Sequence, residues 1–409
     1  MAAERELLVA SYRAAVAAAD PLKIVPAQLP KPPRGRTLAV GAGKAAASMA
    51  AALEAHWPAG APLSGLVITR YGHGLPTGRI RVVEAGHPIP DESGERAARE
   101  ILSLARGLGP DDLLLALVSG GGSALLSAPV DGVSMAELKG LTAQLLRSGA
   151  TIQEINTVRK HLSAIQGGRL AAACRAPAVA LIISDVVGDE PTHIASGPCA
   201  PDPTTCADAE EVTRRFGISF DKKKFQETPK PGDASFARVE NRVIATAMRS
   251  LHAAGEVFRA RGIEPVNLGD RITGEAAEVG RAMAELARAR LGGAPSALVS
   301  GGECTVTLGD AAGRGGRNAE FALALAIALG GAKNVWALAA GTDGIDGTED
   351  NAGAVIAPDT ISRAGDVRLD PRDFLERHDS YSFFQALGDL VVTGPTRTNV
   401  NDYRAILVT

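Results

Sequence analysis

The sequence predicts an α/β protein with two domains and mainly parallel sheets, and three observations support this prediction. The chain has 409 residues, whereas one ordinary domain has roughly 100–200, so two domains are expected. Short apolar runs alternate with longer segments of helical period, which is typical of alternating strands and helices. Many short runs are continuously apolar, as expected for a sheet that is covered on both faces.

Each expected strand is a short apolar run, and each expected helix is a longer segment in which apolar residues recur at helical spacing. In chain order, the expected strands are Thr37–Val40, Gly65–Thr69, Ile80–Glu84, Asp112–Val118, Ala178–Ser184, Pro265–Leu268, Ser296–Ser300, Cys304–Leu308, Asn334–Ala339, Leu390–Thr393 and Ala405–Val408. The expected helices are Lys44–His56, Glu92–Arg106, Met135–Arg147, Val239–Arg261, Gly274–Arg290 and Asn318–Leu329.

One segment has the composition of a linker. Asp221–Asp233, with sequence DKKKFQETPKPGD, is charged, contains two prolines and has no periodicity. We therefore expect domains at residues 1–228 and 235–409. A chain that leaves one domain and returns to it later is the alternative that the sequence leaves open.

Composition and charge narrow the possible partners and the compartment. A net charge of −3 with 22% charged residues gives no indication of a nucleic-acid partner. The acidic start, MAAERE, argues against a secretory signal, and the longest apolar stretch, Phe321–Ala332, is shorter than the about 20 residues that span a bilayer. The four cysteines form no C-x-x-C pair, which favours a reducing compartment without structural zinc. We expect a cytoplasmic protein with no membrane partner, and homo-oligomerisation stays open.

Three glycine-rich segments each follow an apolar run. They read VGAGKAAA from Val40, VSGGGSA from Val118 and VSGGEC from Val299. Glycine lets the backbone turn sharply and present N–H groups to an anion, although such a turn is also common packing geometry. The expected nucleotide-binding residues are Gly41, Gly43, Ser119, Gly120, Gly121, Gly122, Ser123, Gly301 and Gly302.

The first of these segments also fits the dinucleotide pattern G-x-G-x-x-A. That pattern needs an acid at the end of the second strand. The second expected strand ends in Thr69 and Arg70, so only an NADPH-binding protein that uses Arg70 for the extra phosphate would fit. Lys44 follows the turn at an expected helix start, where a cation opposes the helix dipole, so it is expected to meet an anion unless it is a solvated surface lysine. The sequence contains neither G-x-x-x-x-G-K-[ST] nor the H-R-D and D-F-G motifs.

Acidic residues follow several expected strands, at the edge where parallel α/β sheets bind ligands. Carboxylates at such ends suit a divalent metal that is shared with substrate phosphates, and the alternative for each is an Asx turn or helix cap. The expected metal ligands are Asp185, Asp189 and Glu303, and Asp185 and Asp343 are also candidate catalytic acids.

Basic residues supply the remaining candidates. Arg317 precedes an apolar helix, where the helix dipole gives it no support, so a functional role is expected. Arg159 and Lys160 are candidate substrate-binding residues, although cations in the last turn of a helix also compensate its dipole. His87, in a proline-rich turn, is a further candidate for substrate, with a structural turn histidine as the alternative.

Taken together, nine segments resemble the class II glycerate 2-kinases, a family also labelled hydroxypyruvate reductase or MOFRL. They run in family order over nearly the whole chain, from about residue 35 to 403. The segments are VGAGKAAASMA, AGHPIPDESG, LVSGGGSALLSAP, INTVRKHLSAIQGGRLA, LIISDVVGDEPTHIASGPCAPDPTT, LVSGGECTV, GRGGRNAEFALA, GTDGIDGTEDNAGA and TGPTRTNVND.

The resemblance implies two Rossmann-like α/β/α domains, of glycerate kinase N-terminal and MOFRL type, with an active-site cleft between them. It implies that ATP and Mg²⁺ are used to phosphorylate D-glycerate at its 2-hydroxyl. The family's catalytic lysine corresponds to Lys44 and its important arginine to Arg317. Asp343 or Asp185 would accept the hydroxyl proton, and the sequence does not choose between them.

The chain departs from the resembled family at three positions. The family more commonly has lysine at the position of Gln166, glutamine at that of Ala319 and glycine at that of Arg397, which leaves the range of substrates open. An NAD(P)H-dependent hydroxypyruvate reductase is the main alternative, and a non-catalytic sugar-acid sensor is a second.

Overall fold

The computed structural model describes residues 2–308 and 313–409, and it divides into two compact units. The middle unit is Pro21–Ile244, and the terminal unit combines Met1–Asp20 with Ala245–Thr409. The chain therefore leaves the terminal unit and returns to it, which is the alternative that the sequence left open. The return lies at residues 244–245, not at the expected boundary between residues 228 and 235. The expected linker belongs to the middle unit because Phe225 is buried in one of its hydrophobic clusters and Thr228 donates to Asp202.

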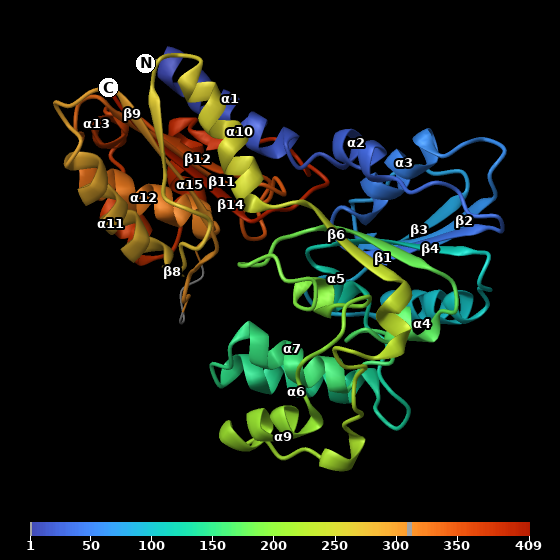
Figure 1. The fold of residues 1–409 in the computed structure, drawn as a ribbon. Helices are drawn as coiled ribbons and strands as arrows, with labels where there is room; N and C mark the ends of the chain where they lie inside the picture. Colours follow the sequence, from blue (N-terminus) through green and yellow to red (C-terminus); the bar gives the residue numbers. More distant parts are fainter. Residues whose placement is uncertain (1, 309–312) are drawn as a thin grey trace. The chain divides into compact units, whose positions relative to one another are not determined.

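The middle unit is built on a six-stranded sheet of order β3-β2-β1-β4-β5-β6. Strands β1 to β5 pair in parallel, as the continuous apolar runs predict. The sheet lies between helices in Figure 1. Its strands are β1 (Thr37–Ala42), β2 (Leu63–Arg70), β3 (Ile80–Ala85), β4 (Leu113–Ser119), β5 (Ala178–Ile183) and β6 (Val239–Ala245).

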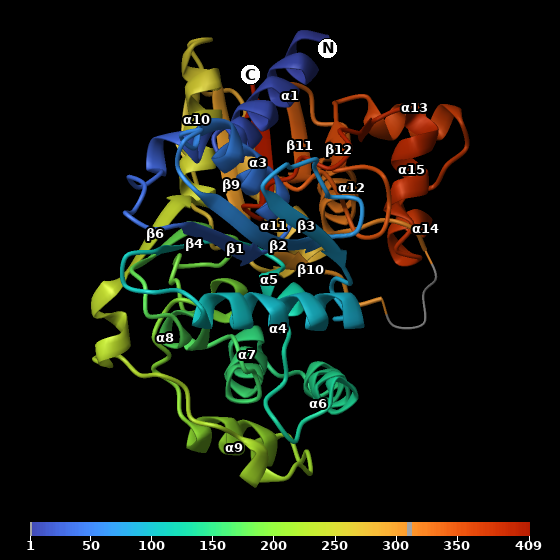
Figure 2. The ribbon, with the colours of Figure 1, turned by 90° about the vertical axis from the view of Figure 1, so that its right-hand side faces the viewer.

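Helices cover both faces of this sheet, α4 on one side and α3 on the other (Figure 2). Alternate β1 residues Leu38 and Val40 pack in one hydrophobic cluster with Ile101 of α4, as the two-residue period of a strand requires. A separate cluster joins α6, α7 and α9, each of which begins with a capping box. The helices are α2 (Pro21–Ile24), α3 (Ala46–His56), α4 (Glu92–Arg106), α5 (Gly122–Leu125), α6 (Met135–Arg147), α7 (Ile152–His161), α8 (Arg169–Ala173) and α9 (Cys206–Arg215), with 3₁₀ turns η1 (Pro26–Gln28), η2 (Ile194–Ser196), η3 (Lys222–Lys224) and η4 (Ala234–Arg238).

The expected helix Val239–Arg261 is wrong in its first part. Val239–Ala245 form strand β6 at the edge of the middle sheet, and α10 begins only after Thr246, whose side chain accepts a hydrogen bond from the N–H of Arg249. Thr246 is therefore an N-cap, and the residues before it pair with β5 instead of continuing the helix.

The sheet of the terminal unit is mixed, which corrects the expectation of mainly parallel sheets. Its order is β13-β12-β11-β14-β9-β7, and among its described strands only β7 and β9 pair in parallel. The C-terminal strand β14 inserts antiparallel between β9 and β11, a long-range pairing that local sequence cannot indicate. The strands are β7 (Glu264–Asn267), β9 (Ser296–Gly302), β11 (Val335–Gly341), β12 (Gly353–Ile356), β13 (Leu390–Val391) and β14 (Asp402–Val408), beside a small pair of β8 (Gly274–Glu275) and β10 (Cys304–Thr305).

Two hydrophobic clusters hold helices against opposite faces of this sheet. Helices α1 and α10 pack on one face with Leu338 and Leu407, whereas α11 and α12 pack on the other with Ala339 and Ile406. The helices are α1 (Ala2–Ala17), α10 (Ala247–Arg259), α11 (Ala276–Arg288), α12 (Arg317–Leu329), α13 (Thr360–Asp366), α14 (Pro371–Glu376) and α15 (Ser380–Leu387). Among the described residues, no helix is both long enough and apolar enough to cross a membrane.

Candidate active site

The glycines after β1 allow two neighbouring strands of the middle unit to approach closely. A Cβ atom on Gly41 would lie 1.9 Å from the carbonyl oxygen of Leu117, and one on Gly43 would lie 2.1 Å from Oγ of Ser119. Their φ angles of 155° and 142° also lie where side chains are strained. Glycine is therefore required here by the packing of β1 against β4.

The N–H groups of this first turn already have partners within the protein. The amide of Gly43 donates to the carbonyl of Ile68, that of Lys44 to the carbonyl of Gly120, and that of Ala45 to Oγ of Ser119. These amides are the groups that would cradle a phosphate in a dinucleotide-binding turn. The turn instead fixes the start of α3 and the backbone position of Lys44.

The glycine-rich turn after β4 brings three of the expected site residues together. Gly121 has φ of 84°, and a Cβ atom on it would lie 3.1 Å from the His87 ring and 3.4 Å from Cγ of Lys44. The amides of Gly121, Gly122 and Ser123 precede the first hydrogen-bonded turn of α5, whose earliest donors are Ala124 and Leu125. This turn, rather than the one after β1, has the geometry of an anion site.

Two polar side chains hold this turn in place, and the sequence did not identify either as part of the site. The buried Gln166 donates from Nε2 to the carbonyls of Ser123 at 2.9 Å and Leu126 at 3.0 Å. Ser196 donates from Oγ to Oγ of Ser123 at 2.9 Å. Ala195 and Ser196 have left-handed φ angles of 51° and 57°, and such strain in non-glycine residues often marks functional sites. A lysine at position 166, as in the resembled family, could donate to the same carbonyls.

The acids that follow β5 lie on one loop of the middle unit. Asp185 is half-buried two residues after the strand ends. Asp189 follows in a turn, with φ of 57° and its N–H donating to the carbonyl of Val186. Both therefore lie beyond the carboxyl end of a parallel strand, as the sequence predicts.

The basic pair on α7 has a different environment from the one expected. Lys160 is 1% exposed and its Nζ lies 2.7 Å from Oδ1 of the fully buried Asp202. Burial alone would raise the pKa of Asp202, but Lys160 outweighs it and lowers that pKa. Lys160 is thus held in a buried ion pair, and its assignment to substrate stays a prediction. Arg159 donates to Oγ1 of Thr142, and burial lowers its pKa.

In the terminal unit, Arg317 is the first residue of α12 and is held by a buried carboxylate. Its Nε donates to both oxygens of Asp402, at 3.0 and 2.8 Å, and its Nη1 lies 3.0 Å from Oε1 of Glu303. Burial acts against the charge of Arg317, but Asp402 and Glu303 outweigh it and raise its pKa. Arg317 is therefore a fixed cation, with a third of its side chain exposed.

Asp402 is the centre of a larger network. It also accepts hydrogen bonds from Nδ2 of Asn318 and from Nη2 of Arg404, both at 3.0 Å. Burial by itself would raise the pKa of Asp402, but Arg317 and Arg404 outweigh it and lower that pKa. In the sequence, this aspartate ends the segment TGPTRTNVND, and its only local signal is a lone acid at the start of an apolar strand.

The two aspartates after β11 have structural contacts. Oδ1 of Asp343 accepts from the N–H of Ile345, which is the Asx turn that stood as its alternative role. Asp346 accepts from the N–H groups of Asn318 and Ala319 and so caps α12. Burial raises the pKa of Asp346 to about 6.

The glycines at the end of β9 serve packing. A Cβ atom on Gly302 would lie 2.2 Å from the carbonyl of Ile272, and Gly301 donates to the carbonyl of Gly269 while accepting from Nη1 of Arg404. Arg397 has φ of 58°, in the region that favours glycine, which gives a conformational reason for the commoner glycine of the resembled family.

Comparison with known proteins identifies the family. A model described as a domain of unknown function, DUF4147, matches residues 7–226, and the MOFRL family model matches residues 296–402. A D-glycerate 2-kinase of Thermotoga maritima is 40% identical over 97% of each chain. A crystal structure of glycerate kinase from the same organism has a TM-score of 0.90 at 37% identity and covers 100% of both chains. The chain belongs to the DUF4147/MOFRL glycerate kinase family.

Members of this family do not all carry the same name. An Agrobacterium vitis protein, provisionally named hydroxypyruvate reductase, is 53% identical over 99% of this chain and 94% of its own. Both names had been anticipated from the sequence motifs. The glycerate kinase structure matches this chain over its full length. The two proteins therefore share the α/β fold, including the parallel sheet of the middle unit.

Proposed function

We propose that the protein transfers the γ-phosphoryl group of ATP to the 2-hydroxyl of D-glycerate, giving 2-phospho-D-glycerate. The observation that carries this proposal is the meeting of Lys44, His87 and the Gly121 turn at the carboxyl ends of β1 and β4. Backbone amides and a lysine at one point suit an anionic phosphate chain, because phosphoryl transfer depends on positioning and on positive charge.

In this proposal the residues of the middle unit act on the nucleotide. The amides of Gly121, Gly122 and Ser123 bind phosphate oxygens, and Lys44 places its charge on the phosphate chain. Gln166 and Ser196 keep the turn in its binding conformation through their contacts with Ser123. His87, next to Gly121, contacts the substrate or the transferring group.

Arg317 supplies the second fixed cation. Its orientation is set through Nε by the buried Asp402, so little conformational entropy is lost when an anion reaches it. Because Glu303 already pairs with Arg317, we assign Glu303 to tuning that cation rather than to metal binding.

The carboxylates after β5 fit magnesium in their chemistry. Mg²⁺ prefers oxygen ligands and is usually held by one or two carboxylates together with substrate phosphates. Asp185 and Asp189 supply such oxygens beyond the carboxyl end of β5. When bound, the ion would neutralise charge on the phosphates. Asp185 or Asp343 accepts the proton of the glycerate hydroxyl.

The alternative, a hydroxypyruvate reductase, is favoured by the name of the Agrobacterium relative. The glycine-rich turn after β1 argues against it. Dinucleotide binding would need the amides that Ile68, Gly120 and Ser119 already engage. The strand β2 also ends in Arg70, without the acid that binds the ribose.

Product analysis tests the proposal. The protein is incubated with D-glycerate, Mg²⁺ and ATP, and the product is coupled to enolase without added phosphoglycerate mutase. Formation of 2-phosphoglycerate gives an immediate signal. A product identified as 3-phosphoglycerate would refute the position of transfer, and NADPH oxidation with hydroxypyruvate that outpaces phosphorylation would refute the reaction class.

A further inference from the structure

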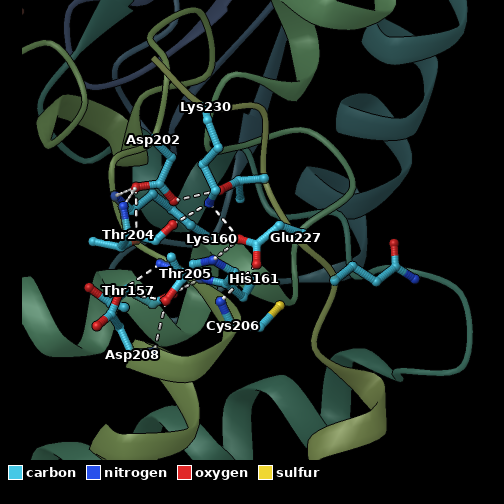
Figure 3. A network of polar contacts seen from close by, with 12 residues as sticks. Thr157, Lys160, His161, Asp202, Thr204, Thr205, Cys206, Asp208, Glu227 and Lys230 are labelled. Carbon is cyan, nitrogen blue, oxygen red and sulfur yellow. Dashed lines mark hydrogen bonds and ion pairs between the residues drawn. The ribbon is translucent and has the colours of Figure 1, made fainter. Parts of the chain in front are cut away.

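We propose that His161, Cys206 and Glu227 form a binding site for one zinc ion. This ion would have a structural role and would take no part in phosphoryl transfer. The three residues come from separate segments of the middle unit: the last residue of α7, the first residue of α9 and the extended chain that follows η3. Their ligand atoms all lie within 4.8 Å of one another (Figure 3). They are the one such group of three found in the described part of the chain.

The orientation of the His161 ring suits a metal cation at this point. Nδ1 lies 2.8 Å from the carbonyl oxygen of Thr157, and a carbonyl can only accept, so Nδ1 carries a proton. Nε2 faces Oε1 of Glu227 at 3.3 Å. With the proton on Nδ1, a neutral ring has its lone pair on Nε2, so a metal cation placed between Nε2 and Oε1 would be bound by both atoms.

The sulfur of Cys206 favours the metal. A proton on Nε2 would complete the contact between His161 and Glu227, and the Cys206 thiol would then only donate a hydrogen bond to that carboxylate. Zinc binds imidazole nitrogen, thiolate sulfur and carboxylate oxygen together. A histidine that ligates zinc also usually donates its other N–H to a carbonyl or carboxylate, as His161 does to Thr157.

The surroundings hold the ligands in place before any ion binds. The N–H of Cys206 donates to Oε2 of Glu227 at 3.2 Å, and Thr205 and Asp208 close a capping box at the start of α9. His161 is fully buried. A donor set that is already oriented loses less entropy on binding than one assembled by the ion.

Among the described residues, two cations act on Glu227: Arg169 through its charge, and Lys230 through a direct ion pair. The Nζ of Lys230 lies 2.5 Å from Oε1 of Glu227, but it also donates to Oγ1 of Thr228 and to the carbonyl of Thr204, so it keeps partners when the carboxylate turns to a metal. Burial raises the pKa of the Cys206 thiol, and the charge of Glu227 adds to this. A divalent cation reverses both effects and stabilises the thiolate.

Such an ion would fasten the helical cluster of α6, α7 and α9. This cluster has its own small hydrophobic core, separate from that of the sheet, and Phe225 joins it just before Glu227. The absence of C-x-x-C spacing does not bear on this site, because each ligand comes from a different segment.

Cobalt binding tests the proposal independently of catalysis. Protein freed of metal with a chelator is titrated with Co²⁺, and thiolate-to-cobalt charge transfer and tetrahedral d–d absorption are measured. We expect one equivalent to bind and to be displaced by Zn²⁺. Zinc at about 100 times its Kd should raise the melting temperature by roughly 5–10 °C.

Two variants and one control locate the site. Cys206→Ser should abolish the charge-transfer band, and Glu227→Gln should weaken cobalt binding at least about tenfold, whereas Glu211→Gln, at an exposed glutamate of α9, should bind as the wild type does. Of the four cysteines, all in the described part of the chain, the other three are buried. A protein that binds no cobalt, or a band that survives in Cys206→Ser, overturns the proposal. Loss of stability in Glu227→Gln without any cobalt binding would identify an imidazolium–carboxylate pair instead.

Discussion

Replacing Asp402 with asparagine should lower both the stability of the protein and its kinase activity. The side chain is buried between Arg317 and Arg404, and Arg404 is itself 1% exposed. Asparagine keeps the shape but removes the charge, so two guanidinium groups lose their common anion. Breaking a buried pair in this way costs about 3–5 kcal/mol, which corresponds to roughly 6–20 °C in melting temperature.

The expected loss of activity has a separate cause. Asparagine offers Nε only one oxygen in place of two and no charge, so Arg317 is held less firmly, and misplacement of a positioning group by about 1 Å can cost on the order of 10²-fold. We therefore expect kcat with ATP and D-glycerate to fall about 10²-fold, measured well below the melting temperature of the variant.

Asp389 provides a matched control in the same unit. It is also buried and also pairs with two arginines, Arg5 and Arg363, but both are about a third exposed and lie outside the candidate site. Asp389→Asn should lose some stability, about 1–3 kcal/mol, and keep its kcat. If Asp402→Asn keeps kcat within about threefold of the wild type, Asp402 does not position a catalytic arginine.

Three further predictions concern the other groups of the candidate site. Lys44→Met should lower kcat on the order of 10²-fold or more with little change in melting temperature, and a fall confined to KM for ATP would show that Lys44 only binds the nucleotide. Gln166→Ala should cost about 1–3 kcal/mol in thermal unfolding because Ser123 and Leu126 lose a buried donor, whereas Gln166→Lys should restore most of it. The pKa of Asp346 is raised from 3.8 to about 6, so its contribution to stability is present below about pH 4 and is lost as the pH rises through 6. Compared with Asp346→Asn, the wild type should therefore lose roughly 2–4 kcal/mol in unfolding free energy between pH 4 and pH 8, and an unchanged difference would contradict the shift.

Local patterns predicted the middle unit well because its sheet is built from neighbouring strands of continuous apolar sequence. The runs at Thr37–Val40 and Asp112–Val118 became β1 and β4, with nearby bounds. The terminal unit was harder, because β14 pairs with β9 and β11 across long stretches of chain. The helix expected from Val239 failed because pairing of β6 in the sheet outweighed a periodicity that continues into α10.

The candidate site could be predicted only where local geometry and chemistry coincide. The turn at Gly121 was visible as a glycine run, but the sequence could not show that the turn at Gly41 uses its own amides internally. Lys160 resembled a ligand-binding lysine because nothing near it in sequence indicates its partner, Asp202, 42 residues later. Local sequence does not indicate the roles of Asp402 and Asp346 for the same reason, since each acts on α12 from a distant segment.

The threading of the chain through the terminal unit has a consequence for biosynthesis. Helix α1 leaves the ribosome before the rest of the terminal unit, yet its Tyr12 donates to the carbonyl of Gly341 and its Ser11 accepts from Tyr403, 392 residues away. At about 5–20 residues per second, those partners emerge on the order of twenty seconds or more after the helix. The middle unit can fold during that interval, while the apolar face of α1 stays exposed to solvent. This nascent helix is therefore the segment that we expect chaperones to cover until β14 has been synthesised.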